Sequence, residues 1–191
     1  MKFEQQFEVP AQPADTYALL VDLERVAPCI PGGEVGPIEQ DGSHKATIAV
    51  RLGPMRMTYR GTVRIAESDD AAHHAVLAAD VREQRGQGSA KATMRMAVEP
   101  GGAGSLVATE TEVKLTGRAA QMGRGVIEDV AGKLVEDLSR CVASRFEAPS
   151  GNGNPAAPAP EPAKPVSGFR LMARVLWERI KRIFNRKGES R

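Results

Sequence analysis

The chain has 191 residues, of which 41% are hydrophobic and 26% are charged, with a formal net charge of +2. At this length we expect one well-packed domain and no second full domain. Its two cysteines, Cys29 and Cys141, are too few for a disulfide framework and fit a reducing compartment. The N-terminus has no apolar run typical of a signal peptide, and no segment approaches the ~20 apolar residues that span a bilayer. We therefore expect a cytoplasmic protein.

Charge is distributed unevenly along the chain. The segment from Gly168 to the C-terminus holds eight Lys or Arg residues against two Glu, which gives it a charge of +6. The rest of the chain therefore carries −4. A basic tail on a mildly acidic body indicates that the tail has a partner of its own.

Alternation of apolar and polar residues predicts a strand ending at Pro10 and further strands between Val35 and Leu115. A short helix is expected from Pro13 through Leu20, with the proline at its start, where a missing N–H costs nothing. The later strands are expected near residues 47–52, 55–65, 75–82, 94–98 and 107–115.

A long helix is predicted over residues 118–146, because its apolar residues fall at helical spacing. One strand, a short helix, an antiparallel meander and a long closing helix make an α+β domain over residues 1–147. We expect the sheet to wrap around this C-terminal helix.

Residues 148–167 contain six of the thirteen prolines and are expected to form an extended, disordered linker. At ~3.1 Å per residue in polyproline geometry, it could reach on the order of 60 Å.

Residues 168–191 are predicted to form a basic amphipathic helix that lies on an anionic membrane surface. Docking of this helix on a partner protein, or on its own domain, is the alternative. The residues expected to meet the membrane are Phe169, Arg170, Met172, Arg174, Leu176, Trp177, Ile180, Lys181, Ile183 and Phe184.

Methionines gather on one face of the predicted strands, opposite a helix stripe that begins with small residues. Methionine is flexible and polarizable, which suits a surface that accommodates a long apolar ligand. We therefore expect an apolar cavity near the start of the long helix, although methionine as ordinary core filler is the alternative. The expected lining residues are Met55, Met57, Tyr59, Met94, Met96, Ala119, Met122, Gly123, Val126 and Val130.

Signals for catalysis are weak. No spacing of Cys or His residues fits a metal site, and Cys29 between two prolines is better explained as a packed loop residue than as a nucleophile. The acidic residues of the long helix are expected on a solvated face, with Asp129–Lys133 and Glu136–Arg140 as i,i+4 pairs. We expect no catalytic residues and no nucleic-acid binding.

Five short motifs occur in a fixed order along the body: Phe7-Glu-Val-Pro-Ala11 after Phe3, Leu19-Leu20-x-Asp22, Cys29-Ile-Pro-Gly-Gly-Glu34, Gly53-Pro54 before Tyr59-x-Gly61, and Thr116-Gly-Arg-Ala-Ala-Gln-Met-Gly-Arg124. On these motifs the chain resembles the carbon monoxide dehydrogenase G-subunit family over about residues 1–147. That family belongs to the START-like, Bet v 1-like superfamily, also called SRPBCC, whose helix-grip fold matches the element order above.

The resemblance implies an accessory role in carbon monoxide oxidation beside the molybdenum-containing carbon monoxide dehydrogenase, without catalysis of its own. It implies that the chain holds this enzyme at the inner face of the cytoplasmic membrane. Together with the expected cavity, it suggests a carrier of respiratory quinone, menaquinone or ubiquinone, with no covalent cofactor. A structural adaptor or maturation factor without a ligand is the first alternative, and a small hydrolase or cyclase is the second.

Overall fold

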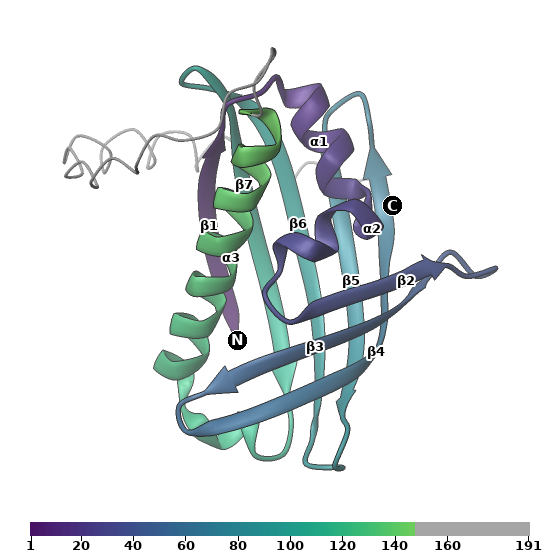
Figure 1. Cartoon of the computed structure of the whole chain (residues 1–191), viewed down its shortest axis with the longest axis vertical. Helices are drawn as coiled ribbons and strands as arrows, with labels where there is room; N and C mark the ends of the chain where they lie inside the picture. Colours follow the sequence, from purple (N-terminus) through teal and green to yellow (C-terminus); the bar gives the residue numbers. More distant parts are fainter. Residues whose placement is uncertain (148–191) are drawn as a thin grey trace, which may run out of the picture. The chain divides into compact units, whose positions relative to one another are not determined.

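The computed structural model describes residues 1–147. The linker predicted over residues 148–167 and the membrane helix predicted over residues 168–191 lie outside the described residues and remain predictions. Figure 1 shows the described part in colours that follow the sequence. Its elements are, in chain order, β1 (Lys2–Val9), α1 (Pro13–Val21), α2 (Leu23–Val26), the 3₁₀ turn η1 (Ala27–Cys29), β2 (Gly33–Ile38), β3 (His44–Leu52), β4 (Met55–Asp69), β5 (His74–Glu83), β6 (Ser89–Gly101), β7 (Gly104–Leu115), the 3₁₀ turn η2 (Ala119–Met122) and α3 (Arg124–Phe146).

The strands form one seven-stranded antiparallel sheet in the order β1-β7-β6-β5-β4-β3-β2. Strands β2 to β7 form a meander in which each strand pairs with the next along the chain, and β1 joins the far edge beside β7. The predicted α+β class is confirmed, with the long helix against a single antiparallel sheet.

The long strand β4 passes very close to β5 at Gly61. A Cβ atom at this position would collide with the backbone carbonyl oxygen of Asp80. Only glycine permits this approach, which explains the glycine two residues after Tyr59 in the sequence.

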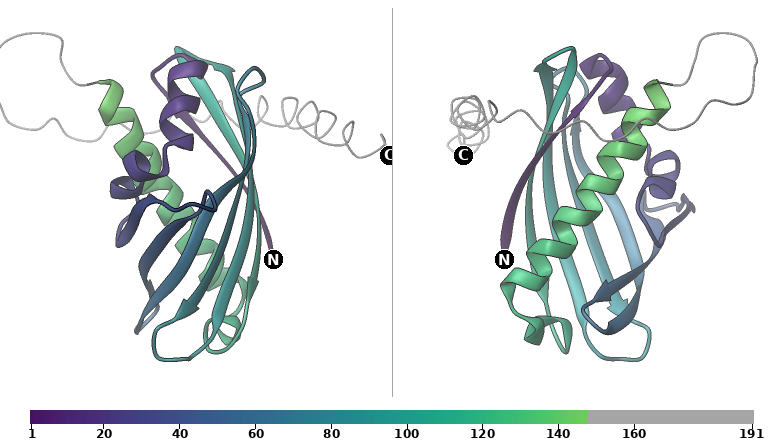
Figure 2. Two further views of the ribbon diagram at one scale, coloured as in Figure 1. Left: turned by 90° about the vertical axis from the view of Figure 1, so that its right-hand side faces the viewer. Right: turned by 60° about the vertical axis from the view of Figure 1, so that its left-hand side comes forward.

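Helix α3 lies over one face of the sheet, with β1 on one side of it and β2 and β3 on the other (Figures 1 and 2). Its main contacts with the strands are to β1 and β3, which lie near opposite edges of the sheet, and it also contacts η1. The helix therefore contacts the sheet mainly near its two edges, at β1 and β3, rather than at the central strands.

Helix α3 begins later than the sequence suggested. The predicted start at Arg118 is wrong. Ala119–Met122 form the separate turn η2, and Gly123, with a φ of +81°, separates this turn from α3. This left-handed conformation, which favours glycine, makes Gly123 the N-cap of α3.

Cys29 and Cys141 form a disulfide that joins η1 to α3 across 112 positions of sequence. This single bond is no disulfide framework, but it contradicts the interpretation that both cysteines are the reduced thiols of a reducing compartment. Spacing alone could not reveal the pair, because only the fold brings their Cα atoms within 5.3 Å. Cys29 is buried, as expected for a packed loop residue.

Candidate functional site

The apolar core between α3 and the sheet is divided into two clusters. The first cluster surrounds α1 and α2 and includes Tyr17, Leu20, Met96, Val107 and Val142. The second cluster lies toward the N-terminal end of α3, where its buried members are Phe3, Met57, Tyr59, Val81, Ala119 and Ile127.

Between the clusters runs a band of apolar residues, Ala79, Ala92, Met94 and Leu134, which we call the middle band. Among residues 1–147, these four belong to neither cluster, and each remains partly exposed. Ala79 pairs with Ala92 across β5 and β6, and Met94 pairs with Leu77 of the first cluster.

The same order holds along each element that crosses the band. On α3, Val130 belongs to the second cluster and Leu138 to the first, while Leu134 lies one turn from each. On β5, Leu77 packs in the first cluster and Val81 in the second, with Ala79 between them on the same face. The middle band is therefore an apolar stripe on the inner face of the domain that the core does not fully bury.

The structure divides the predicted lining residues among these regions. Met57, Tyr59, Ala119, Met122, Val126 and Val130 belong to or pack against the second cluster. Met96 lies in the first cluster instead, buried to 3% exposure, and Met94 lies in the middle band between the two. Met55 is partly exposed and, among the described residues, belongs to neither cluster.

The expectation that Gly123 faces the strand methionines is wrong. Gly123 is exposed, and a Cβ built there meets no atom of the described chain within 4 Å. The side chain of Met122 instead reaches the β3–β4 turn, since its Cε atom lies 3.7 Å from a Cβ built on Gly53. The η2 segment thus covers the end of the second cluster through Met122 and through Ala119, which is 1% exposed.

Tyr59 supplies a polar group inside the second cluster. Its side chain is 4% exposed, and its hydroxyl donates to the sulfur of Met57 at 3.7 Å, a weak hydrogen bond. Burial raises the pKa of Tyr59, and the nearby carboxylate of Glu83 raises it further. The phenol therefore stays protonated and can donate to an oxygen placed beside it.

The buried Glu83 has a structural role at the β5–β6 turn. Its Oε2 atom accepts hydrogen bonds from the backbone N–H groups of Arg85 at 2.7 Å and Gln87 at 3.1 Å. These contacts give the carboxylate partners within the turn, so its burial needs no catalytic explanation.

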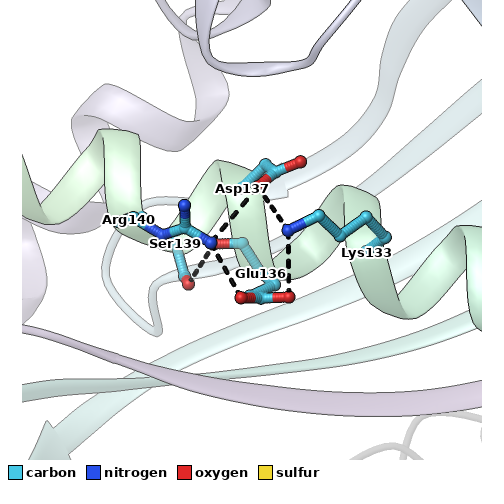
Figure 3. Close-up of polar contacts among 5 residues, drawn as sticks. All are labelled: Lys133, Glu136, Asp137, Ser139 and Arg140. Atoms are coloured by element: carbon cyan, nitrogen blue, oxygen red, sulfur yellow. Dashed lines mark hydrogen bonds and ion pairs between the residues drawn. The ribbon is translucent and has the colours of Figure 1, made fainter. Parts of the chain in front are cut away.

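The outer face of α3 is covered with ion pairs (Figure 3). Lys133 bonds to Glu136 at 3.2 Å and to Asp137 at 3.0 Å, while Arg140 meets Glu136 at 2.7 Å. Hydrogen bonds to Asp137 and then Glu136 raise the pKa of Lys133. The predicted Glu136–Arg140 pair is confirmed, but Lys133 turns toward Asp137 rather than toward Asp129. This face is solvated, as expected.

Over residues 1–147, no three His, Cys, Asp or Glu side chains come together as a metal site would require. In the same part of the chain, no helix combines the length and apolar character needed to cross a membrane.

Sequence reasoning missed the middle band and the outer face of β4. The band could have been noticed from alanines at inward positions of two neighbouring strands, Ala79 and Ala92. The outer face of β4 has arginine at every fourth residue, Arg56, Arg60 and Arg64, a spacing that puts all three on one side of a strand.

Solved structures share this fold at low sequence identity. A conserved protein from Geobacillus kaustophilus matches with a TM-score of 0.68 and 15% identity, covering 77% of this chain and 95% of its own. Ara h 8.0201 matches with a TM-score of 0.55 and 18% identity, over 78% of this chain and 99% of its own. A START superfamily protein from Mycobacterium smegmatis matches with a TM-score of 0.50 and 17% identity, over 76% and 97%.

These likenesses show the fold alone, a START-like, Bet v 1-like helix-grip domain. No curated protein sequence matches the chain. The family model for the G-subunit of carbon monoxide dehydrogenase (CoxG) matches residues 6–147, which include nearly the whole described domain. The chain therefore belongs to the CoxG family of carbon monoxide dehydrogenase.

Proposed function

We propose that the chain is a non-catalytic accessory protein of molybdenum carbon monoxide dehydrogenase that binds respiratory quinone between α3 and the sheet. It would recruit the enzyme to the inner face of the cytoplasmic membrane and move quinone between the bilayer and the enzyme. The family match supports the association with the dehydrogenase.

The middle band is the observation that carries the ligand proposal. A core built only for stability would pack at close to crystal density, because an unfilled site loses both apolar burial and contacts. Here four apolar side chains on α3, β5 and β6 stay partly exposed between two packed clusters. A flat ring with an isoprenoid chain has the shape and polarity to cover such a stripe.

Two features of the inner face, one in the band and one in the second cluster, suit a quinone. The thioether of Met94 offers a polarizable contact to a ring. The hydroxyl of Tyr59 has only the sulfur of Met57 as its hydrogen-bond partner among the described residues, so a quinone carbonyl oxygen would be a better acceptor.

The tail supplies the proposed membrane contact. Its sequence separates a Trp- and Phe-containing apolar face from a Lys- and Arg-rich face over residues 168–191. If residues 148–167 are extended as their prolines predict, they would give the folded domain a reach on the order of 60 Å from a membrane-bound helix. This arrangement would let one protein meet both the lipid-dissolved quinone and the enzyme.

Organic extraction of the purified full-length chain, followed by mass spectrometry, tests the proposal. Menaquinone or ubiquinone at close to one equivalent per chain is the expected result. An extract without quinone, together with no binding of added quinone, would reject the carrier and leave the ligand-free adaptor or maturation factor. Turnover of an added ester or polyketide substrate would instead favour the hydrolase or cyclase alternative.

A further inference from the structure

The outer face of strands β3, β4 and β5 carries a group of five exposed arginines, which we call the arginine face: Arg51, Arg56, Arg60, Arg64 and Arg82. On β4, Met57 and Tyr59 point into the core, so the alternating arginines of that strand point away from it. The arginine face therefore lies on the side of the sheet opposite α3.

The register of the sheet places like charges directly opposite each other. Arg51 pairs with Arg56 across β3 and β4, and Arg60 pairs with Arg82 across β4 and β5. Like charges at facing positions destabilise an antiparallel sheet. The stability of the fold therefore gives no reason for this arrangement.

Within residues 1–147, none of the five arginines forms an ion pair. Arg60 has a neutral partner, because the side-chain oxygen of Gln84, in the orientation that satisfies both groups, accepts from its Nη2 atom at 3.0 Å and from its Nε atom. Two carboxylates near these arginines have other partners. Asp41 accepts hydrogen bonds from Ser43, which lower its pKa more than Arg64 does. Asp80, on the same face of β5 as Arg82, forms an ion pair with Lys91 at 2.6 Å.

The chemistry between the arginines favours a protein partner over a membrane. The residues between the arginines on the outer face are Thr47, Ala49, Thr58 and Thr62 on β3 and β4, and Ala78 and Asp80 on β5. These positions offer no large apolar side chain for insertion into lipid. They offer no aromatic side chain on which a nucleic-acid base could stack. Guanidinium groups held on a sheet suit bidentate pairing with carboxylates, and arginine is enriched at protein interfaces whereas lysine is depleted.

We propose that the arginine face is the docking surface for an acidic protein surface, and that this surface belongs to the carbon monoxide dehydrogenase. The assignment rests on the proposed function, because it names the surface of this chain that the dehydrogenase would contact. It leaves the inner face of the sheet, with the middle band and α3, free of the partner.

Binding of the full-length chain to purified carbon monoxide dehydrogenase from the same organism, measured by calorimetry at two salt concentrations, tests this assignment. The test variant combines Arg56→Glu with Arg64→Glu. The control combines Lys2→Glu with Lys114→Glu, which reverses the same number of charges at exposed positions of β1 and β7. We expect the arginine variant to lose at least tenfold in affinity and most of its salt dependence, while the control stays within about threefold of the wild type.

Equal losses in the two variants, or no loss in either, would overturn the assignment, because binding would then depend on net charge or on another surface. An arginine variant that still binds the enzyme but no longer binds vesicles with anionic lipid would overturn it in favour of a membrane contact. A wild-type chain that does not bind the dehydrogenase would reject the association in the proposed function, and this inference with it. Circular dichroism and melting temperature confirm that both variants fold.

Discussion

The hydroxyl of Tyr17 in α1 donates to the backbone carbonyl oxygen of His74 in β5 at 3.0 Å, with the Asp70 carboxylate 3.2 Å away as a second acceptor. Tyr17 is 4% exposed and packs within the first cluster. This contact ties the helical cap of the domain to the β4–β5 turn. A buried polar contact of this kind fixes where α1 lies on the sheet.

Replacing Tyr17 by Phe is expected to lower the free energy of unfolding by about 1 kcal/mol at pH 7, because the carbonyl oxygen of His74 and the carboxylate of Asp70 lose their hydrogen-bond donor. Burial, followed by the hydrogen bond to Asp70, raises the pKa of Tyr17 from 10.0 to about 12. A raised pKa means that this stabilisation is complete below pH 10 and is lost as pH rises toward about 12. Urea unfolding measures the free energy of unfolding at pH 8 and at pH 11. Between these two pH values it should fall less for the variant than for the wild type. Tyr59→Phe, which loses only a contact to sulfur, should cost less at pH 7.

The middle band can be tested with the same substitution at two positions of one strand. Ala79→Leu adds a bulky side chain to the band, whereas Ala75→Leu adds it to the first cluster, where Ala75 is 2% exposed. We expect Ala79→Leu to keep the wild-type melting temperature but to lose binding of a short-chain benzoquinone or naphthoquinone. Ala75→Leu should overpack the core and destabilise the domain by about 1–3 kcal/mol.

Calorimetric titration of the quinone and thermal unfolding of both variants give the two measurements. If Ala79→Leu destabilises the domain as much as Ala75→Leu does, the band is an ordinary packed core and the proposed ligand site is absent.

The membrane prediction can be tested by placing a glutamate on either the apolar or the polar face of the predicted tail helix. Trp177→Glu puts a carboxylate on the apolar face, and Leu171→Glu puts one on the polar side of the predicted helix. Sedimentation with anionic liposomes should show nearly complete loss for Trp177→Glu and a small loss for Leu171→Glu. Wild-type binding should also weaken with added salt, since exposed charges are screened within ~8 Å at physiological ionic strength. Equal binding by both variants would count against an interfacial helix.

The disulfide predicts a thermal shift on reduction. Closing a loop of 112 positions constrains the unfolded chain, and a native disulfide typically contributes about 2–4 kcal/mol. The Cys141→Ser variant and the reduced wild type should therefore melt at the same lowered temperature. A thiol assay of the unreduced, denatured protein should find no free thiol, and two free thiols there would show that the bond does not form in solution.

The fold was predictable because its elements follow local patterns. Alternating residues such as Val107 and Thr109 in β7 mark a strand facing a core, and the stripe that includes Ile127 and Leu138 marks α3. The start of α3 was not predictable in the same way. Gly123 could equally sit inside a helix or cap one, and only its φ of +81° decides between them.

The candidate site was harder to predict because it depends on how deep each side chain lies between two layers. Met94 and Met96 share a strand face, so the sequence pattern predicts the same environment for both. The structure buries Met96 in the first cluster, to which residues of α1 also belong, and leaves Met94 in the middle band. This difference depends on elements that lie far from β6 in the sequence. The disulfide was missed for the same reason.

The position of the disulfide bears on how the domain would respond to mechanical load. Helix α3 ends at Phe146, five residues beyond Cys141, so any pull through residues 148–191 enters the folded body at that end. Without a crosslink, such a pull would separate α3 from the sheet one turn at a time, starting with Phe146 and Val142. With the Cys29–Cys141 bond in place, the tension passes to η1 and the helices before it, so the domain resists as a whole and the contacts of α3 beside the middle band stay unloaded.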